Sequence, residues 1–498
     1  MAHISIIGSG FSGISAAAYL ARSGHEVHVY EKNSLPGGRA RQLVTDEGYV
    51  FDMGPSWYWM PGVFEKFFAD FGHKVSDFYL LQLLSPAFEI VFGKNEVMQV
   101  PSDFQELLAL FESIEPGSAV KLEKFMAEAE AKYKIGMEDL VYRPSLSIRE
   151  FMSVDVLSKA VRSDIFKSFS KHVRKFFSNE KLIALMEFPT LFLGAEPSRI
   201  PALYSLMNYA GLKLGTWYCE GGFGSVISAM KRVAEENGAQ FHFDATVEKV
   251  FTDGDVVTEL LVNGEFYKTD GVIAAADYHH VDSKLLPEGK RNYDESYWKK
   301  KTFAPSCLIF YVGVSKKIKK LAHHTLFFDE KLALHAKEIY KDPRWPTKPL
   351  FYVCCPSKTD KTVAPQGCEN LFLLMPVAPG LNDGEAVREE YFNKMLTRLE
   401  AFAGEEIGQW INYKKSYCVS DFVTDYNSYK GNAYGLANTL AQTAIFKPKI
   451  SNRKIANLFY AGQLTVPGPG VPPSIISGQI AAGLLNKYLS TIQNEVTV

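Results

Sequence analysis

The segment HISIIGSGFSGISAAAYLARSGHEVHVYE, residues 3–31, decides the fold expected for this chain. A β-prone run, His3–Ile7, leads into a glycine-rich turn, and a helix-favouring, alanine-rich run follows over Ile14–Arg22. A second β-prone run, Glu26–Tyr30, ends next to Glu31. A strand, a helix and a second strand within about thirty residues form a βαβ unit, so the sequence predicts a Rossmann-like domain.

The turn carries the pattern G-x-G-x-x-G at Gly8, Gly10 and Gly13. The first glycine allows the tight turn, the second lets a pyrophosphate approach the backbone, and the third lets helix and strand pack closely. The helix start offers free N–H groups and a partial positive charge to phosphates, and an acid at Glu31 suits a ribose hydroxyl. The cofactor-binding residues predicted from this unit are Gly8, Gly10, Phe11, Ser12, Gly13, Glu31 and Lys32.

Two further glycine-containing loops follow this unit and favour FAD over NAD. The first, Pro36-Gly37-Gly38-Arg39-Ala40, resembles the second pyrophosphate-contacting loop of FAD oxidoreductases of the amine-oxidase type. Its glycines admit phosphates, and Arg39 can meet them as a fork-shaped cation. The second loop, Asp52-Met53-Gly54-Pro55-Ser56, is expected to bring its backbone under the flavin. The residues predicted to bind FAD here are Gly37, Gly38, Arg39, Asp52, Gly54, Pro55 and Ser56.

The far end of the chain completes the predicted cofactor site. Residues 457–462 (NLFYAG) indicate a strand arriving at a glycine, followed by the loop Pro467–Pro473 and a helix of small residues. Backbone amides at this helix start are placed to meet the flavin. The predicted contacts are Gly462, Gln463, Gly470 and Val471, together with Val247 from the middle of the chain.

Composition and patterning suggest an α/β (α+β mixed) protein of interleaved parts. Residues 100–215 are mainly helical in pattern, residues 305–375 are rich in β signals, and no linker separates them. We expect a Rossmann-like FAD-binding domain, a β-rich substrate domain and a helical lid that associates with membranes. Their predicted ranges are 1–75, 215–290 and 450–498 for the first, 76–100 and 291–449 for the second, and 101–214 for the third.

The overall charge and the cysteines exclude some classes of protein. The 498 residues carry 54 basic and 56 acidic side chains, which argues against a general nucleic-acid binder. The six cysteines include no C-x-x-C pair, and the adjacent Cys354 and Cys355 fit a buried strand, so we expect reduced thiols in a cytoplasmic protein. We also find no spacing typical of metal ligands and predict no metal.

Two apolar stretches could be mistaken for export or membrane signals. The N-terminal stretch has no Lys or Arg before its apolar residues, unlike a signal peptide. The stretch Ile455–Asn486 is uncharged, but four prolines interrupt it. We therefore expect neither a signal peptide nor a transmembrane helix. The segment 155–181 instead has seven Lys/Arg and four Phe, which suits either peripheral contact with a bilayer on the cytoplasmic face or an ordinary amphipathic helix.

Motifs along the whole chain resemble the bacterial phytoene desaturase (carotene desaturase) family of FAD enzymes. Besides the FAD loops, the matching segments are residues 192–194, 202–207, 215–218, 220–222, 276–280, 425–433 and 462–473. The resemblance implies FAD-dependent desaturation of phytoene, from 15-cis-phytoene towards lycopene, in carotenoid biosynthesis. A hydride would leave an allylic carbon for the flavin, and a proton would be lost. The hydrophobic substrate would come from the membrane, and oxygen or a quinone would take the electrons.

Other activities on the same framework stay open at this point. They are desaturation of diapophytoene or of a hydroxycarotenoid, isomerisation or saturation of a carotenoid, and a flavin amine or porphyrinogen oxidase activity. A non-catalytic nucleotide-binding or membrane-adaptor protein would have lost the flavin-facing loops. For the lost proton, Glu150 is a candidate acceptor because it lies in a helical segment near the expected pocket, although a solvated helix face explains it as well.

Overall fold

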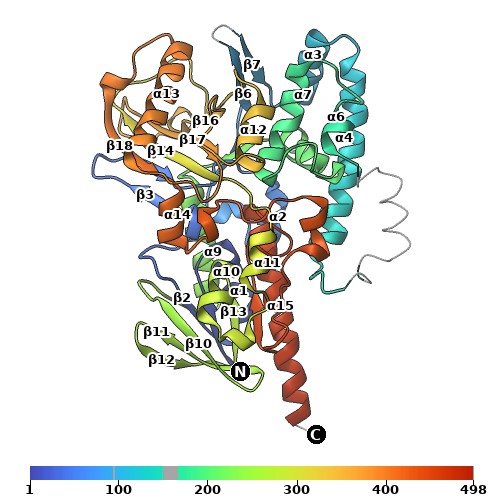
Figure 1. Cartoon of the computed structure of the whole chain (residues 1–498), viewed down its shortest axis with the longest axis vertical. Helices are drawn as coiled ribbons and strands as arrows, with labels where there is room; N and C mark the ends of the chain where they lie inside the picture. The colour runs from blue at the N-terminus through green and yellow to red at the C-terminus, as the bar shows by residue number, and fades with distance from the viewer. Residues whose placement is uncertain (94–95, 148–149, 151–166, 497–498) are drawn as a thin grey trace.

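A computed structural model describes residues 1–93, 96–147, 150 and 167–496 of the chain. A parallel sheet lies near both chain ends at the bottom of Figure 1, a larger mixed sheet lies at the upper left, and helices α3, α4, α6 and α7 lie at the upper right. The predicted mixed α/β fold is confirmed by this arrangement.

The parallel sheet is assembled from distant parts of the chain. Its strand order is β19-β13-β1-β2-β9, and every neighbouring pair is parallel. The strands are β1 (His3–Ile7), β2 (Glu26–Tyr30), β9 (Ala239–His242), β13 (Gly271–Ala274) and β19 (Leu458–Tyr460). Both strands predicted at the N-terminus are confirmed at the predicted residues. A three-stranded antiparallel sheet adjoins it, made of β10 (Val247–Asp253), β11 (Val256–Val262) and β12 (Glu265–Lys268).

Helices from both chain ends pack tightly beside this sheet. Helix α1 (Phe11–Arg22) contacts α15 (Val471–Val496) and α9 (Phe223–Glu236). The α1–α15 contact is close because a Cβ on Gly478 would lie 2.2 Å from the carbonyl oxygen of Ser12. The Ser15 hydroxyl also donates a hydrogen bond of 2.8 Å to the carbonyl of Ile475. The two ends of the chain therefore form one packed unit.

A seven-stranded sheet makes the second large layer. Its order is β18-β14-β17-β16-β15-β6-β7, antiparallel except where β15 runs parallel to β6. The strands are β6 (Phe88–Gly93), β7 (Glu96–Val100), β14 (Ser306–Val314), β15 (His324–Phe327), β16 (Phe351–Cys354), β17 (Glu369–Val377) and β18 (Ile411–Tyr417). All nine residues of β14 are buried, as its unbroken apolar sequence leads one to expect. Helix α13 (Glu385–Ala403) contributes Phe392, Met395 and Leu399 to the core cluster shared with β14.

The helical region begins with α3 (Phe104–Ile114) and α4 (Ser118–Lys134). Asp103 caps α3 by accepting hydrogen bonds from two backbone N–H groups. Helices α6 (Phe169–Val173) and α7 (Glu180–Glu187) follow. Of the basic, Phe-rich segment 155–181, residues 155–166 lie outside the described residues. In the described part Phe169 and Phe177 are buried, so these two rings face the protein core rather than a lipid surface.

The remaining elements are short or connect these layers. They are the strands β3 (Gln42–Val44), β4 (Val50–Asp52), β5 (Leu81–Leu83) and β8 (Trp217–Cys219), and the helices α2 (Pro61–Asp70), α8 (Leu206–Asn208), α10 (Tyr278–His280), α11 (Glu295–Lys300), α12 (Leu332–Tyr340) and α14 (Val419–Tyr426). Within the described ranges no helix has the length and apolar character needed to cross a bilayer. All six cysteines are described and are unpaired.

Candidate functional site

One large cavity, of about 560 Å³, extends from the ends of the parallel strands to the face of the seven-stranded sheet. It brings together glycine loops that are more than 400 residues apart in the sequence. Of the predicted site residues, those that border it are Gly8, Gly10, Phe11, Ser12, Glu31, Lys32, Gly37, Gly38, Arg39, Gly54, Pro55, Ser56, Val247, Gly462, Gln463, Gly470 and Val471. Gly13, Asp52 and Glu150 are not part of its wall.

The glycine turn has the geometry of a phosphate cradle. Gly8 has a φ of 99°, which favours glycine, and a Cβ on Gly13 would lie 2.0 Å from the Gly8 carbonyl oxygen. A Cβ on Gly10, by contrast, would meet no atom within 4 Å, so this position opens onto free space. The first bond of α1 runs from the Ile14 N–H to the Gly10 carbonyl, which leaves the preceding N–H groups without an acceptor inside the helix.

Glu31 is buried at the end of β2 and fixes the turn. One carboxylate oxygen accepts hydrogen bonds from the backbone N–H and the hydroxyl of Ser9, at 2.9 and 3.0 Å. The other accepts from the backbone and side-chain nitrogens of Asn33, at 3.0 and 2.8 Å. Glu31 therefore holds the glycine turn in place while it borders the cavity.

Arg39 and Asp277 supply opposite charges to the cavity wall. The Arg39 guanidinium lies over the Tyr426 ring, and its Nη2 donates to the Ser428 hydroxyl at 3.2 Å. The Nε of Arg39 and the Oδ2 of Asp277 are buried and have no hydrogen-bond partner among the described residues. Burial raises the pKa of Asp277, which the positive charge of Arg39 partly offsets. The unpartnered Nε and the open cradle at Gly10 fit the phosphates of FAD.

Asp277 is not among the site residues predicted from the sequence. A signal for it was present, because Asp277 follows β13 and polar residues at the carboxyl ends of parallel strands mark ligand sites in such sheets.

Asp52, which the sequence predicts to bind the cofactor, does not border the cavity. Its carboxylate accepts hydrogen bonds from the backbone N–H groups of Phe223 and Gly224, at the start of α9, and from the Gln42 side chain. Burial raises its pKa to about 6. Asp52 pairs with Gln42 across β3 and β4, and this pairing turns it towards α9 instead of the cavity. The loop that follows it, residues 54–57, does reach the cavity.

Glu150, the candidate proton acceptor, has a local structural role. Its carboxylate accepts hydrogen bonds of 2.8 to 3.0 Å from the backbone N–H groups of Ser145, Leu146 and Ser147. A carboxylate occupied by three backbone donors stabilises a turn. The geometry therefore gives no support to a catalytic role for Glu150.

Beyond the glycine loops most of the cavity wall is apolar. It combines side chains from the helical region with side chains from α12 and the seven-stranded sheet. These residues are Met137, Leu140, Val141, Leu191, Leu193, Leu203, Leu206, Met207, Leu326, Phe328, Leu332, Ala336, Ile339, Leu350 and Leu374. His335 also lies in this wall, but both of its ring nitrogens bind backbone, namely the Pro376 carbonyl and the Leu350 N–H. This half of the cavity suits a hydrocarbon.

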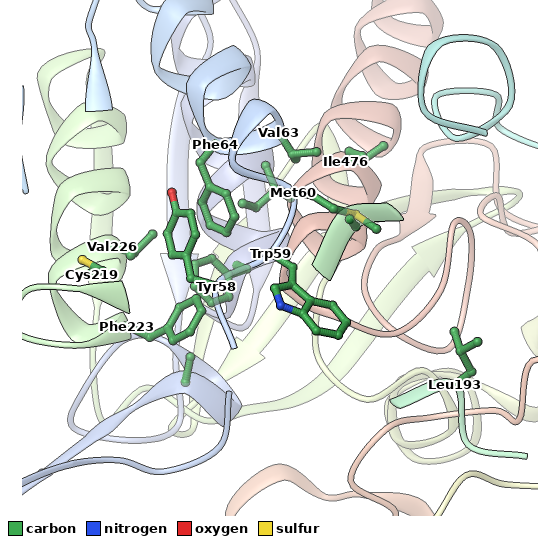
Figure 2. Close-up of a cluster of buried hydrophobic side chains, with 14 of the residues drawn as sticks. Tyr58, Trp59, Met60, Val63, Phe64, Leu193, Cys219, Phe223, Val226 and Ile476 are labelled. Carbon is green, nitrogen blue, oxygen red and sulfur yellow. The ribbon is translucent and has the colours of Figure 1, made fainter. Parts of the chain in front are cut away.

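The segment 57–60 joins the two halves of the cavity. Figure 2 shows Tyr58 packed against Phe64 and Phe223, whereas Trp59 points away from this cluster, towards the side where Leu193 lies. The Trp59 indole donates a hydrogen bond of 2.9 Å to the Thr216 hydroxyl. Tyr58 thus anchors the segment in the core, and Trp59 forms cavity wall.

A buried lysine lies behind the proline-glycine loop. The end of the Lys447 side chain lies 3.2 Å from where a Cβ of Gly468 would be, and its Nζ has no hydrogen-bond partner in the part of the chain that the structure describes. Burial, with the nearby charge of Lys301, lowers its pKa to about 7. Lys447 is therefore one of the costliest polar groups to bury in this region.

Two histidines and a cysteine meet at the back of the cavity wall. Donor atoms of His323, His324 and Cys354 lie within 4.8 Å of one another, and all three residues are buried. The sequence contains no ligand spacing that predicts this cluster, because His324 and Cys354 become neighbours only through the pairing of β15 with β16.

Sequence comparison places the chain beside known flavoproteins. A profile described as "Flavin containing amine oxidoreductase" matches residues 11–486. The carotenoid 3,4-desaturase of Haloarcula japonica is 40% identical over 483 residues, which cover 97% of this chain and 97% of that protein. The zeta-carotene-forming phytoene desaturase of Myxococcus xanthus is 31% identical over 484 residues (96% and 92%). A 4,4'-diapophytoene desaturase of Staphylococcus aureus is 29% identical over 493 residues (96% and 97%).

Solved structures share the fold at low sequence identity. An oxidoreductase from Methanosarcina mazei matches with a TM-score of 0.64 and 16% identity, over 96% of this chain and 99% of that one. A putrescine oxidase variant matches with a TM-score of 0.62 and 13% identity, over 98% and 99%. At these identities the likeness concerns the fold.

Proposed function

Because the chain belongs to the flavin-containing amine oxidoreductases and, within them, to the carotenoid desaturases, we propose that it uses FAD to desaturate a carotenoid near one end of its chain. The bond we favour is the one between carbons 3 and 4. The observation that carries this proposal is the cavity, which joins a dinucleotide cradle to a long apolar wall. No hydrogen-bonding pattern for an amine or a carboxylate is needed there, since a polyene offers only hydrocarbon surface.

Desaturation needs a hydride acceptor and a cavity wall that positions the substrate and excludes water. FAD, when bound, supplies an acceptor for the hydride that leaves the saturated bond. Gly8, Gly10 and the start of α1 would hold the phosphates, and Arg39 would neutralise their charge. The apolar side chains orient the polyene and exclude water, which would otherwise react with a carbon that has lost a hydride.

Sequence identity to the relatives supports our preference for the bond between carbons 3 and 4. The 40% identity to a carotenoid 3,4-desaturase exceeds the 31% identity to a phytoene desaturase, and both alignments cover nearly the whole chain. Desaturation of phytoene towards lycopene, the activity first expected from the sequence, stays the second candidate and is supported by the second relative.

We also propose that the enzyme takes its substrate from a bilayer. The segments 143–146 and 443–446 supply both cavity wall and exposed apolar side chains. Leu146 is 42% exposed and Phe446 is 56% exposed, and Lys449 joins the two segments by donating to the Ser145 carbonyl. Exposed apolar groups next to the wall of an apolar cavity favour contact with lipid.

The domain division proposed from the sequence fits this arrangement of sheets. The parallel sheet draws its strands from the ranges 1–75, 215–290 and 450–498, and the seven-stranded sheet draws on 76–100 and 291–449. We assign cofactor binding to the first part and substrate binding to the second, with the helices of 101–214 covering the cavity.

The test compares three substrates with one preparation of enzyme. The purified protein, carrying FAD, is mixed with liposomes that contain phytoene, diapophytoene, or a longer conjugated carotenoid that is still saturated between carbons 3 and 4. Each added conjugated bond shifts the absorption to longer wavelength. We expect the fastest shift with the third substrate. A faster shift with phytoene would replace 3,4-desaturation by the second candidate, and no long-wavelength shift with any carotenoid would refute the desaturase proposal.

A further inference from the structure

A chain of hydrogen bonds leads from the cavity into the seven-stranded sheet. Ser56 and Tyr352 both border the cavity, and their hydroxyl oxygens are 3.0 Å apart. The Tyr352 hydroxyl lies 2.5 Å from Nδ1 of His324, which is completely buried. Tyr352 is on β16 and His324 is on β15, where they are diagonal neighbours on one face of the antiparallel pair.

The surroundings fix the protonation of this pair. Burial raises the pKa of Tyr352 well above 10, so the phenol keeps its proton and donates it towards Nδ1. Burial, together with the neighbouring His323, lowers the pKa of His324 well below 6.5, so the imidazole is neutral. In the tautomer that carries its proton on Nε2, the Nδ1 atom accepts the hydrogen bond from Tyr352. The titratable groups around His324 are His323, Tyr352 and Cys354. The His324 ring also stacks on the Trp57 ring, with 4.1 Å between the ring centroids.

Desaturation requires a proton acceptor beside the apolar half of the cavity, where the polyene would lie. Asp277 is in the charge field of Arg39 in the cofactor half, where the phosphates would bind. Once a hydride has left one carbon, the C–H bond on the next carbon becomes strongly acidic, so a weak base is sufficient. Glu150 is occupied by backbone donors and is not in the wall. Both ring nitrogens of His335 are likewise occupied by backbone.

We propose that Tyr352 and His324 accept the proton released by desaturation, an inference that rests on the proposed function. The hydride would leave with both electrons of its C–H bond, which FAD would accept when bound. The second C–H bond breaks, its electron pair forms the new π bond, and its proton moves to the Tyr352 oxygen. The proton of Tyr352 moves at the same time to Nδ1 of His324, which becomes an imidazolium. In this scheme Tyr352 is the catalytic residue and His324 is a positioning residue that acts through it.

The test measures a single turnover without oxygen. Enzyme carrying FAD is mixed with liposomes of the carotenoid that the wild type oxidises fastest, and the flavin absorbance is followed in water and in deuterium oxide. The variants are Tyr352→Phe and His324→Gln. The matched control is Tyr391→Phe, which removes another buried tyrosine hydrogen bond of 2.7 Å, to the Pro346 carbonyl, on α13 away from the cavity.

We expect both variants to keep the flavin spectrum and the KM, while the rate of flavin bleaching falls by about 100-fold or more, as for loss of a general base. The wild type should show a slower reaction in deuterium oxide, and Tyr352→Phe should abolish this difference. Tyr391→Phe should behave as the wild type does. His324→Gln serves alone if Tyr352→Phe does not fold.

The outcomes separate this inference from the proposed function. If no carotenoid bleaches the wild-type flavin, the proposed function fails. If the wild type is bleached and either folded variant is bleached at a similar rate with an unchanged solvent isotope effect, the function stands and the assignment of Tyr352 and His324 is overturned.

Discussion

Gly13 and Gly8 are in such close contact that a Cβ on Gly13 would lie 2.0 Å from the carbonyl oxygen of Gly8. A Cβ on Gly10, between them, would meet no atom within 4 Å. Within one motif, Gly13 is therefore needed for close packing of the chain, whereas Gly10 leaves space in which a ligand can bind.

This difference predicts opposite effects for two alanine substitutions. Gly13→Ala forces α1 away from β1 and should destabilise the protein by about 1–3 kcal/mol or more, as overpacking does. Gly10→Ala should leave the melting temperature of the FAD-free protein unchanged but weaken FAD binding. Thermal unfolding and flavin fluorescence measure the two effects. Gly483→Ala, on the exposed side of α15, is the control and should stabilise by about 1 kcal/mol. Equal loss of stability in both variants would contradict this division.

Substitution of Arg39 should show whether FAD binding depends on the positive charge of this side chain or on the planar shape of its guanidinium group. Arg39→Lys keeps the charge but loses the planar fork and its place over Tyr426. We expect FAD affinity to fall by about 10- to 100-fold, which corresponds to the loss of a hydrogen bond to a charged group. Titration of FAD-free protein with FAD provides the measurement. Arg232→Lys, on the exposed face of α9, should not change it. Wild-type affinity in Arg39→Lys would show that the fork is not used.

Filling the apolar half of the cavity should block the carotenoid and spare the cofactor. Ala336 on α12 borders this half, and Ala336→Phe adds a ring where the polyene would lie. Carotenoid turnover should fall by about tenfold or more, since shape errors of one or two methylenes already cost this much. FAD content, read from the visible spectrum, should not change. Ala131→Phe on the exposed face of α4 is the control. Unchanged turnover in Ala336→Phe would place the polyene elsewhere.

The rim of the cavity should govern attachment to lipid. Burying a large apolar side chain contributes about 1.5–3 kcal/mol, so the double variant Leu146→Ser/Phe446→Ser should partition into liposomes at least about tenfold less. Co-sedimentation with vesicles measures this. Phe266→Ser replaces an equally large ring, 62% exposed on β12, and should leave partitioning unchanged. If the two variants sediment alike, the rim is not the lipid contact.

Lys447 should make stability depend on pH. Its folded-state pKa of about 7 lies below the ordinary 10.5, so between these values the unfolded chain binds more protons than the native protein. The contribution of Lys447 to the free energy of unfolding therefore increases as pH rises from about 7 to 10.5. Below pH 7 the free-energy cost of burying this lysine is present in full. Lys447→Met should raise the melting temperature most at pH 6 and least near pH 10. A constant difference across this range would contradict a buried neutral amine.

Local patterns predicted the βαβ unit well, because its strands, turn and helix depend on neighbouring residues. The strands over His3–Ile7 and Glu26–Tyr30 begin and end where expected, and the helix begins at Phe11, slightly before the predicted run. The glycine loops were assigned to one site from their expected contacts with phosphate or flavin and from the resemblance to FAD oxidoreductases. The cavity brings them together.

Long-range pairing explains what the sequence could not predict. Asp52 has the residue type of a ligand, but its strand pairing directs it to the start of α9. The carboxylate of Glu150 is occupied by a turn that begins five residues earlier. Tyr352 and His324 carry no local signal at all, since 28 residues separate them and only the register of β15 with β16 makes them neighbours.

The parallel sheet is built from strands at both ends of the chain, and this order has a consequence for biosynthesis. Strand β19 and the loop before α15 are synthesised more than 400 residues after the first βαβ unit, yet they complete the cradle that this unit begins. A growing chain therefore cannot complete this cradle before β19 has been synthesised. A fragment that stops before β19 should stay colourless, because one side of the cofactor site is missing.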